Sequence, residues 1–332
     1  MAGSGTAHLR KEAERALVVD DLVVEFPVKR GTVHAVSGLN LDLLPGETLG
    51  ILGESGCGKS SAGRAIMQLP PPTSGTVGLG DIELTGLSES AMRTARSRMQ
   101  LVLQDPVSAL NPRRRVKDLV AEGLAIWGWG DRSGTERETF IDELLTSVGL
   151  DPRTVRDRRP HELSGGQCQR VCIARALALD PDVLICDEPV SSLDVSVQAQ
   201  ILNLIEETRR HRHLSMLFIA HDVAVVKNIS DRVLVMYLGK TCEVLPADGL
   251  EHHATHPYTR LLLDSVPSAD DADHDPEPAP AVDLPSPLEP PSGCRFRTRC
   301  PWATERCAVE EPELREIRSG HYVACHHVKE IP

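Results

Sequence analysis

The sequence predicts an α/β fold whose mostly parallel β-sheet is covered by helices on both faces. Short apolar runs bounded by turn residues suit buried strands, and they alternate with stretches that have the i, i+3, i+4 apolar spacing of helices. Such alternation is typical of parallel sheets with helical crossovers. Strands are expected within 17–53 and at 75–84, 99–105, 182–189, 215–222 and 232–240. Helices are expected at 59–69, 116–129, 139–150, 165–179, 195–211 and 223–229.

The 332 residues exceed what one compact core usually organises, which favours a main domain with an appendage. The strand and helix pattern spans 17–265, after an N-terminal extension at 1–16. A helical stretch at about 106–163 interrupts the pattern and is expected to be an inserted subdomain. Residues 266–292 are rich in proline and acidic side chains, which indicates an extended linker. A cysteine-rich segment at 293–332 follows it.

Composition indicates a folded core and limits the possible partners. Hydrophobic residues make up 41% and charged residues 25%, and the net charge is −12. This acidic balance argues against nucleic-acid binding, which favours a basic face. The N-terminus has no apolar signal core, and no run of about 18 apolar residues could span a membrane. We therefore expect a reducing, cytoplasmic setting in which disulfides are rare.

The stretch GESGCGKS fits the phosphate-binding pattern G-x-x-x-x-G-K-[ST], between an expected strand and an expected helix. Its glycines let backbone N–H groups surround an anion, and the helix N-terminus adds partial positive charge. Lys59 would reach the β- and γ-phosphates, and Ser60 would bind Mg²⁺. A plain glycine-rich turn is the alternative, which this context disfavours. The residues expected to line this phosphate site are Gly53, Glu54, Ser55, Gly56, Cys57, Gly58, Lys59, Ser60 and Ser61.

The stretch VLICDEP supplies two carboxylates at the end of a buried strand. Nucleotides bind at the carboxyl ends of the strands in parallel sheets. Asp187 would therefore hold Mg²⁺, and Glu188 would polarise the attacking water as general base. A strand that merely ends in Asp-Glu-Pro is the alternative, but the neighbouring phosphate-binding pattern favours catalysis.

Four further motifs make the chain resemble the ATP-binding cassette (ABC) ATPases. LSGGQ at 163–167 resembles the family's signature, and it precedes the strand that ends in Asp187. Gln104 matches the Q-loop, SSLD at 191–194 matches the D-loop, and His221 matches the switch histidine. The resemblance covers about residues 17–265 and implies a P-loop NTPase fold with an inserted helical subdomain.

The resemblance implies an active ATPase that works as a dimer, in which the signature of one domain closes over the ATP of the other. Catalysis would rest on Lys59, Gln104, Glu188 and His221, with Mg²⁺ at Ser60, Gln104 and Asp187. The signature and D-loop residues at the nucleotide would be Ser164, Gly165, Gly166, Gln167 and Asp194. An aromatic residue stacks on adenine in the family, and Phe26 and His34 are both candidates. Ser164 also suits the N-cap of the following helix.

Three stretches resemble the oligopeptide/dipeptide importer branch of the family, namely QDPVSALNPRRRV, DEPVSSLDVSVQAQILNLI and HPYTRLLLDSVP. The resemblance implies ATP-driven uptake of peptides or related solutes from a peripheral position on the cytoplasmic face of the membrane. It also implies two permease subunits, a second ABC ATPase subunit and an extracytoplasmic solute-binding protein. Pro257 suits the first turn of a helix. The solute, and the choice between a homodimer and a heterodimer, stay open.

Four of the nine cysteines lie in the last 39 residues, at Cys294, Cys300, Cys307 and Cys325. Four thiolates suffice for a [4Fe–4S] cluster or for Zn²⁺, and a metal would cross-link a segment with little core of its own. The end of the chain also resembles importer ATPases of which some carry such a cluster. We expect [4Fe–4S] before Zn²⁺, with free thiols as the third possibility and a structural or redox-gating role.

Two other functions compete with the importer ATPase. One is a soluble ABC ATPase that acts in translation or DNA repair. The single cassette, the absence of sustained heptads and the acidic charge disfavour it. The other is an importer ATPase whose cysteine tail senses iron or redox state. Cysteine-to-serine changes in the tail would separate the second possibility from a structural role.

Overall fold

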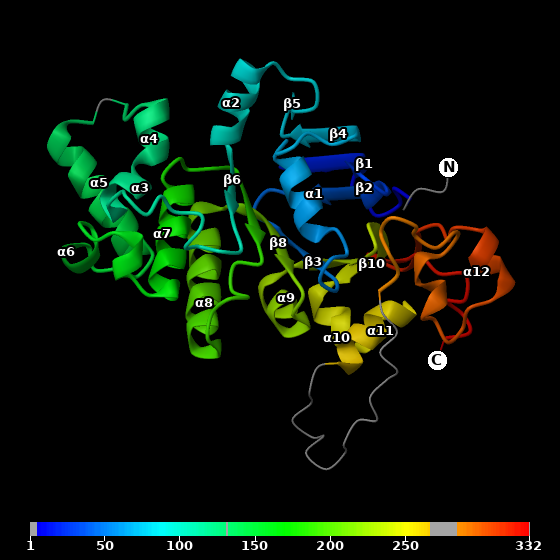
Figure 1. Ribbon diagram of the computed structural model, residues 1–332. Coiled ribbons are helices and arrows are strands. Elements are labelled where there is room, and N and C mark those ends of the chain that lie inside the picture. Colours follow the sequence, from blue (N-terminus) through cyan, green and yellow to red (C-terminus); the bar gives the residue numbers. More distant parts are fainter. Residues whose placement is uncertain (1–4, 131, 266–283, 332) are drawn as a thin grey trace, which may run out of the picture. The chain divides into compact units, whose positions relative to one another are not determined.

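The structure, a computed structural model, describes residues 5–130, 132–265 and 284–331. The chain divides into two compact units, which are described separately. Unit 1 comprises Met1–Asp42, Leu49–Thr85 and Ala220–Pro332, and unit 2 comprises Leu43–Thr48 and Gly86–Ile219. Figure 1 shows their helices and strands, and most of them carry the labels used below. None of the helices in these residue ranges combines the length and the apolar character that crossing a membrane requires.

The first sheet of unit 1 has the strand order β2-β1-β4-β5. Its strands are β1 (Leu17–Val28), β2 (Gly31–Leu43), β4 (Ser74–Leu79) and β5 (Ile82–Glu83). β4 pairs antiparallel with both β1 and β5. Alternate residues of β1 are buried, as the apolar pattern predicts, because successive side chains of a strand point to opposite faces. The antiparallel pairing of these early strands departs from the mostly parallel sheet that the sequence predicts.

A second set of strands in unit 1 has the order β11-β12-β10-β9-β3. These are β3 (Thr48–Leu52), β9 (Arg232–Tyr237), β10 (Lys240–Pro246), β11 (Arg315–Arg318) and β12 (His321–Val323). Only β3 and β9 are parallel, whereas β9, β10, β12 and β11 pair antiparallel in turn. The antiparallel pairs at this edge are exceptions within the mostly parallel sheet that the sequence predicts. The cysteine-rich segment adds two short, partly charged strands that show no apolar alternation of their own.

The helices of unit 1 follow or flank these strands. They are α1 (Lys59–Ile66), α9 (Val223–Ile229), α10 (Leu250–His253), α11 (Pro257–Asp264) and α12 (Glu305–Val309), with 3-10 turns η2 (Ala247–Gly249) and η3 (Arg295–Thr298). α11 begins with Pro257 in its first turn, as expected, and His256 caps it by accepting from the Tyr258 N–H at 3.1 Å. The helix start predicted from HPY is therefore confirmed.

Unit 2 combines parallel strands with the helical stretch that the sequence predicts. β6 (Met99–Val102), β7 (Val183–Asp187) and β8 (Ser215–Ala220) pair in parallel, with β7 in the middle and fully buried. The helices are α2 (Glu89–Ser97), α3 (Val116–Val120), α4 (Glu122–Trp127), α5 (Gly134–Ser147), α6 (Pro152–Val155), α7 (Gly165–Leu177) and α8 (Val195–Arg212), with the 3-10 turn η1 (Pro160–Glu162). The parallel core of the predicted fold is therefore present here.

The first and last described segments of the chain make buried contacts within unit 1. In the predicted N-terminal extension, the buried His8 ring lies 2.9 Å from the Asn40 carbonyl, and Arg10 pairs with the buried Asp42. In the cysteine-rich segment, His321 lies 2.6 Å from Glu243, and both side chains are buried. Most of the predicted linker, 266–283, lies outside the described residues. The domain boundaries read from the sequence stay predictions.

Candidate nucleotide site

The phosphate-binding pattern of unit 1 forms a loop between the buried strand β3 and helix α1. Gly56 and Gly58 have φ values of +80° and +103°, a backbone region that side chains disfavour. A Cβ on Gly58 would lie 2.1 Å from the Ala35 carbonyl oxygen, and one on Gly53 would lie 2.3 Å from that of Met236. Only glycine fits at these two positions, so the loop geometry requires the glycines in the motif.

Lys59 is buried at the start of α1, and its ammonium group contacts the loop itself. Its Nζ donates to the Gly53 carbonyl at 2.7 Å and to the Glu54 carbonyl at 2.9 Å. Ser60 and Ser61 follow in the first turn of the helix, and Ser55 lies exposed in the loop. Burial raises the pKa of the Cys57 thiol, which favours an unreactive thiol. The loop therefore presents a cation next to backbone N–H groups at a helix N-terminus.

Three other predicted residues lie in unit 1. His221 is exposed immediately before α9, whose N-cap is Asp222. The two candidates for adenine stacking, Phe26 and His34, are half-buried on β1 and β2. His34 is 2.7 Å from Glu25, and its backbone N–H donates to the Pro287 carbonyl at 3.0 Å. No contact distinguishes either ring as the stacking residue, so this choice stays open.

In unit 2 the predicted catalytic carboxylates end strand β7. Asp187 is 2% exposed and Glu188 is 8% exposed. The Gln104 Nε2 donates to the Glu188 Oε2 at 3.1 Å and to the Ser191 hydroxyl at 3.4 Å. Glu188 also has a φ of +48°, a strained conformation for a residue with a side chain. The structure thus brings together the Q-loop glutamine and the predicted general base, which lie far apart in the sequence.

The signature residues form the N-terminal turn of α7. Ser164 accepts from the Gln167 N–H at 3.3 Å, and the Gln167 side chain accepts from the Ser164 N–H at 3.0 Å, which completes a capping box. This confirms Ser164 as the N-cap. Gly165 is exposed, so the tip of the helix is open to a partner. Asp194 of the D-loop is the exposed N-cap residue of α8.

The cysteines near the signature are structural. Cys168 and Cys172 are both buried in α7, and burial raises the pKa of each, to about 11 for Cys172. Their Sγ atoms face the backbone carbonyls of Pro160 and Pro106. Neither thiol therefore contributes an anion-binding group at the signature.

The tail cysteines gather, but they do not form a ligand set. Burial, together with charge repulsion among the thiols, raises the pKa of Cys294 to about 12 and that of Cys300 to about 11. Cys307 lies 3.6 Å from the His327 Nε2, and Cys325 accepts from the His327 N–H at 3.4 Å. Within 5–130, 132–265 and 284–331, no three His, Cys, Asp or Glu side chains could together hold a metal ion. The described residues therefore give no geometric support for the predicted [4Fe–4S] or Zn²⁺ centre.

Two residues that touch the phosphate loop were not assigned a role from the sequence. The Tyr258 hydroxyl accepts from the Glu54 N–H at 2.8 Å, and Arg299 forms an ion pair with the Glu54 carboxylate. Tyr258 belongs to the HPY stretch, which predicts a helix start and indicates the importer branch but predicts no contact with the loop. Arg299 lies in the cysteine-rich segment, where the sequence pattern points only to the thiols. Their partner lies more than 200 residues away, so no local signal could have paired them.

Comparisons with known proteins agree with this geometry. A family model described as ABC transporter matches residues 36–191, and one described as oligopeptide/dipeptide transporter, C-terminal region, matches 242–307. The oligopeptide transport ATP-binding protein OppF of Escherichia coli is 47% identical, over 93% of this chain and 95% of that protein. OppF of Salmonella typhimurium is 46% identical over the same shares, and YkfD of Bacillus subtilis is 45% identical over 93% and 94%.

Two solved structures have the same fold. One is a dimeric ATP-binding cassette, MJ0796, in a post-hydrolysis state bound to ADP and Pi. It has a TM-score of 0.63 and 27% identity, over 70% of this chain and 98% of that one. The other is cbiO1 from Clostridium perfringens, part of an ABC transporter complex, with a TM-score of 0.62 and 28% identity over 71% and 90%.

Proposed function

Because the chain belongs to the ABC transporter ATPases of the oligopeptide/dipeptide group, we propose that it is the ATP-hydrolysing subunit of a membrane importer for peptides. It would act from the cytoplasmic face of the membrane, bound to two permease subunits and a second ATPase subunit. A solute-binding protein would deliver the peptide from outside. The observation that carries this proposal is the phosphate loop, whose glycine geometry and buried Lys59 suit a nucleoside triphosphate.

The reaction is hydrolysis of ATP by an activated water. Lys59 and the loop N–H groups would bind the β- and γ-phosphates, and His221 would contact the γ-phosphate. Glu188 would accept the proton of the attacking water while Gln104 orients its carboxylate, a role that their 3.1 Å hydrogen bond supports. Ser60, Gln104 and Asp187 offer the oxygen donors that Mg²⁺ prefers, and the ion would neutralise charge on the phosphates.

Hydrolysis would require two ATPase subunits. The tip of α7 carries Ser164 and Gly165, which are exposed, and Gly166 and Gln167, which are half-buried. This helix N-terminus suits the phosphates of a nucleotide held by a facing subunit. The similarity to a cassette solved as a dimer supports this arrangement. We propose that ATP closes the dimer and that hydrolysis opens it.

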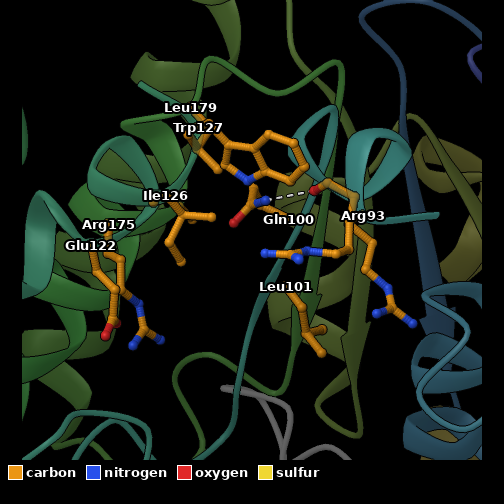
Figure 2. Close-up of a pocket in the computed structure, with 11 residues that line it drawn as sticks. Arg93, Gln100, Leu101, Glu122, Ile126, Trp127, Arg175 and Leu179 are labelled. Atoms are coloured by element: carbon orange, nitrogen blue, oxygen red, sulfur yellow. Dashed lines mark hydrogen bonds between the residues drawn. The ribbon is translucent and has the colours of Figure 1, made fainter. Parts of the chain in front are cut away.

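We propose that a permease loop docks in a groove of unit 2 between α2, β6, α4 and α7. The groove measures about 390 Å³ and has an apolar surface formed by Leu101, Ile126, Trp127 and Leu179. Arg93, Arg175 and Glu122 lie around it, as Figure 2 shows, and Arg96 also lines it. Ile126 and Trp127 are 60% and 41% exposed, which is unusual for large apolar side chains. This arrangement suits a short amphipathic helix that carries an acidic side chain.

The position of this groove supports coupling to the nucleotide. Gln100 and Leu101 of β6 line the groove, and Gln104 follows the same strand and contacts Glu188. If the permease displaced β6, the movement would therefore be transmitted through Gln104 to Glu188, the proposed general base.

The metal centre in the tail is a separate proposal. We propose that Cys294, Cys300, Cys307 and Cys325 bind a [4Fe–4S] cluster, with Zn²⁺ as the alternative. Its support is the donor chemistry of four thiols that influence one another's pKa, since the side-chain geometry adds none. Iron, sulfide and zinc analysis of anaerobically purified protein tests it, and protein free of all three overturns it. Unchanged ATPase and transport after four Cys→Ser changes would reject a regulatory role.

The proposed ATPase function is tested by Glu188→Gln. Removing the general base should lower ATP hydrolysis by about a hundredfold or more while ATP binding is retained. The variant should therefore trap ATP and form a stable dimer, either alone or with its natural ATPase partner. Light scattering gives the mass, and filter binding measures the trapped nucleotide. Lys59→Ala is the control that should lose ATP binding. If Glu188→Gln traps no ATP and stays monomeric even with that partner, the proposal fails.

A further inference from the structure

The phosphate loop is held by a residue from the cysteine-rich segment. Arg299 donates from Nη1 to the Glu54 Oε2 at 2.7 Å and from Nη2 to the Glu54 Oε1 at 2.9 Å. The two side chains are only 13% and 27% exposed. Glu54 is the second residue of the loop, and its backbone N–H is bound by the buried Tyr258 hydroxyl. Both its main chain and its side chain are therefore fixed by C-terminal residues.

An aromatic cluster fixes the position of Arg299. Phe296, which lies three residues before Arg299, packs 5.2 Å from the ring of Tyr237 and 5.4 Å from that of Tyr258. Phe296 is 3% exposed, so η3 is anchored in the core of unit 1. The guanidinium of Arg299 lies 5.8 Å from the ring centroids of both Tyr237 and Phe296, within the range of a cation–π contact.

A second arginine ties the same segment to the far side of the loop. Arg295 donates to the Leu238 carbonyl and, at 2.9 Å, to the Ser37 hydroxyl. The Ser37 N–H donates to the Gly239 carbonyl, and the Gly239 N–H donates to the carbonyl of Cys57 in the phosphate loop at 2.8 Å. The cysteine-rich segment therefore supports the phosphate loop at two points. It contacts Glu54 directly, and it reaches Cys57 through Leu238 and Gly239, which connect β9 to β10.

The negative charge of Glu54 explains why its ion pair with Arg299 matters for phosphate binding. A carboxylate in a loop that binds a polyphosphate repels its ligand, and this repulsion is strong where water is partly excluded. Arg299 cancels that charge in a bidentate pair, the geometry in which arginine binds a carboxylate most firmly. The carboxylate in turn raises the pKa of Arg299, so the guanidinium stays charged at any physiological pH.

We propose that Arg299 is a positioning residue of the ATPase, which neutralises and holds Glu54 so that the phosphate loop can accept ATP. The cysteine-rich segment is then part of the nucleotide site in unit 1, in addition to any role of its thiols. This inference rests on the proposed ATPase function.

The test compares ATP binding with turnover. Arg299→Ala should weaken ATP binding about tenfold, because a charge-assisted bidentate pair is lost and a negative charge is uncovered near the phosphates. The kcat at saturating ATP should change less than about threefold, since no group that contacts the reacting atoms is altered. Arg299→Lys keeps the positive charge and should lose less affinity than Arg299→Ala. Calorimetry with ATP and steady-state ATPase assays measure both quantities.

A second substitution distinguishes the loss of charge neutralisation at Glu54 from a general loss of protein stability. Adding Glu54→Gln to Arg299→Ala should restore part of the lost ATP affinity, because the uncovered charge is then removed. Arg306→Ala is the matched control. Arg306 forms the same bidentate contact, 2.7 and 2.9 Å to Glu310, but this pair is exposed and lies within the tail. The Arg306→Ala variant should bind ATP like the wild type.

The outcomes are distinct. Wild-type ATP affinity in Arg299→Ala, or a double variant that binds ATP no better than Arg299→Ala alone, would overturn the role of Arg299. An equal loss of ATP affinity in Arg306→Ala would also overturn the role of Arg299, because any charge change in the cysteine-rich segment would then weaken ATP binding. Wild-type protein that binds no ATP would instead overturn the proposed function.

Discussion

At the scale of single residues, the second glycine of the signature is fixed by packing between helices. A Cβ on Gly166 would lie 2.6 Å from the Val197 Cγ1 of α8, whereas one on Gly165 would meet only Leu193 at 3.5 Å. The Val197 side chain has few rotamers, so it cannot easily turn away from such a contact. Gly166 therefore lets α7 approach α8 closely, while Gly165 leaves the tip open.

Gly166→Ala should destabilise the protein by about 1–3 kcal/mol, because an overpacked contact forces α7 and α8 apart. Gly165→Ala should change the free energy of unfolding by no more than about 0.5 kcal/mol. Urea denaturation measures both. Val197→Ala, added to Gly166→Ala, removes the clashing methyl and should recover part of the loss. If Gly166→Ala proves as stable as Gly165→Ala, the packing explanation is wrong.

At the scale of elements, the cap of α11 is sensitive to acid. His256 is 2% exposed, and burial lowers its pKa to about 4, although the neighbouring Glu243 opposes this shift. Its Nδ1 must be unprotonated to accept from the Tyr258 N–H. Protonation would break this cap and disturb the aromatic cluster that anchors Phe296.

The sign of the pH dependence follows from the lowered pKa of His256. The unfolded chain takes up its proton near pH 6.5 and the folded chain only near pH 4, so the stabilisation is complete above pH 6.5 and is lost on acidification. His256→Asn keeps a capping acceptor but does not titrate. Between about pH 7 and about pH 4.5, the free energy of unfolding of the wild type should fall by about 2 kcal/mol more than that of the variant. Chemical denaturation at each pH measures the free energy of unfolding. An equal decrease in the wild type and in His256→Asn over this pH range would contradict the prediction.

At the scale of the whole molecule, the unit 2 groove predicts how the ATPase meets its permease. Ile126→Asp with Trp127→Asp should leave the basal ATPase of the isolated protein within about twofold of the wild type, since both side chains are already exposed. Docking to the permease should weaken about tenfold or more, because burying such side chains contributes about 1.5–3 kcal/mol each. Co-purification with the permease and peptide uptake measure this.

Val309→Asp is the control for the groove. Val309 is also a large, exposed apolar residue, at 85%, but it lies on α12 in unit 1. Equal losses of permease binding in the Val309 variant and in the groove variant would show that the groove is not the docking surface.

The sequence alone predicted features that depend on local spacing. The strand, glycine loop and helix around Lys59, the Ser164 cap and the buried strand ending in Asp187 are each encoded within about a dozen residues. Apolar periodicity and turn chemistry act at that range, which is why these elements were confirmed. The short strands β11 and β12 carry no such pattern. Only pairing makes them strands, since β12 pairs with β10 and β11 pairs with β12.

The sequence by itself determined which side chains are available for chemistry, because the motifs fix residue types at set spacings along the chain. Only the tertiary structure decided which of them meet. Gln104 contacts Glu188 across 84 positions, Tyr258 contacts the phosphate loop across 204, and Arg299 across 245. Such contacts exist because the packed core brings distant segments together, and local sequence carries no record of that closure.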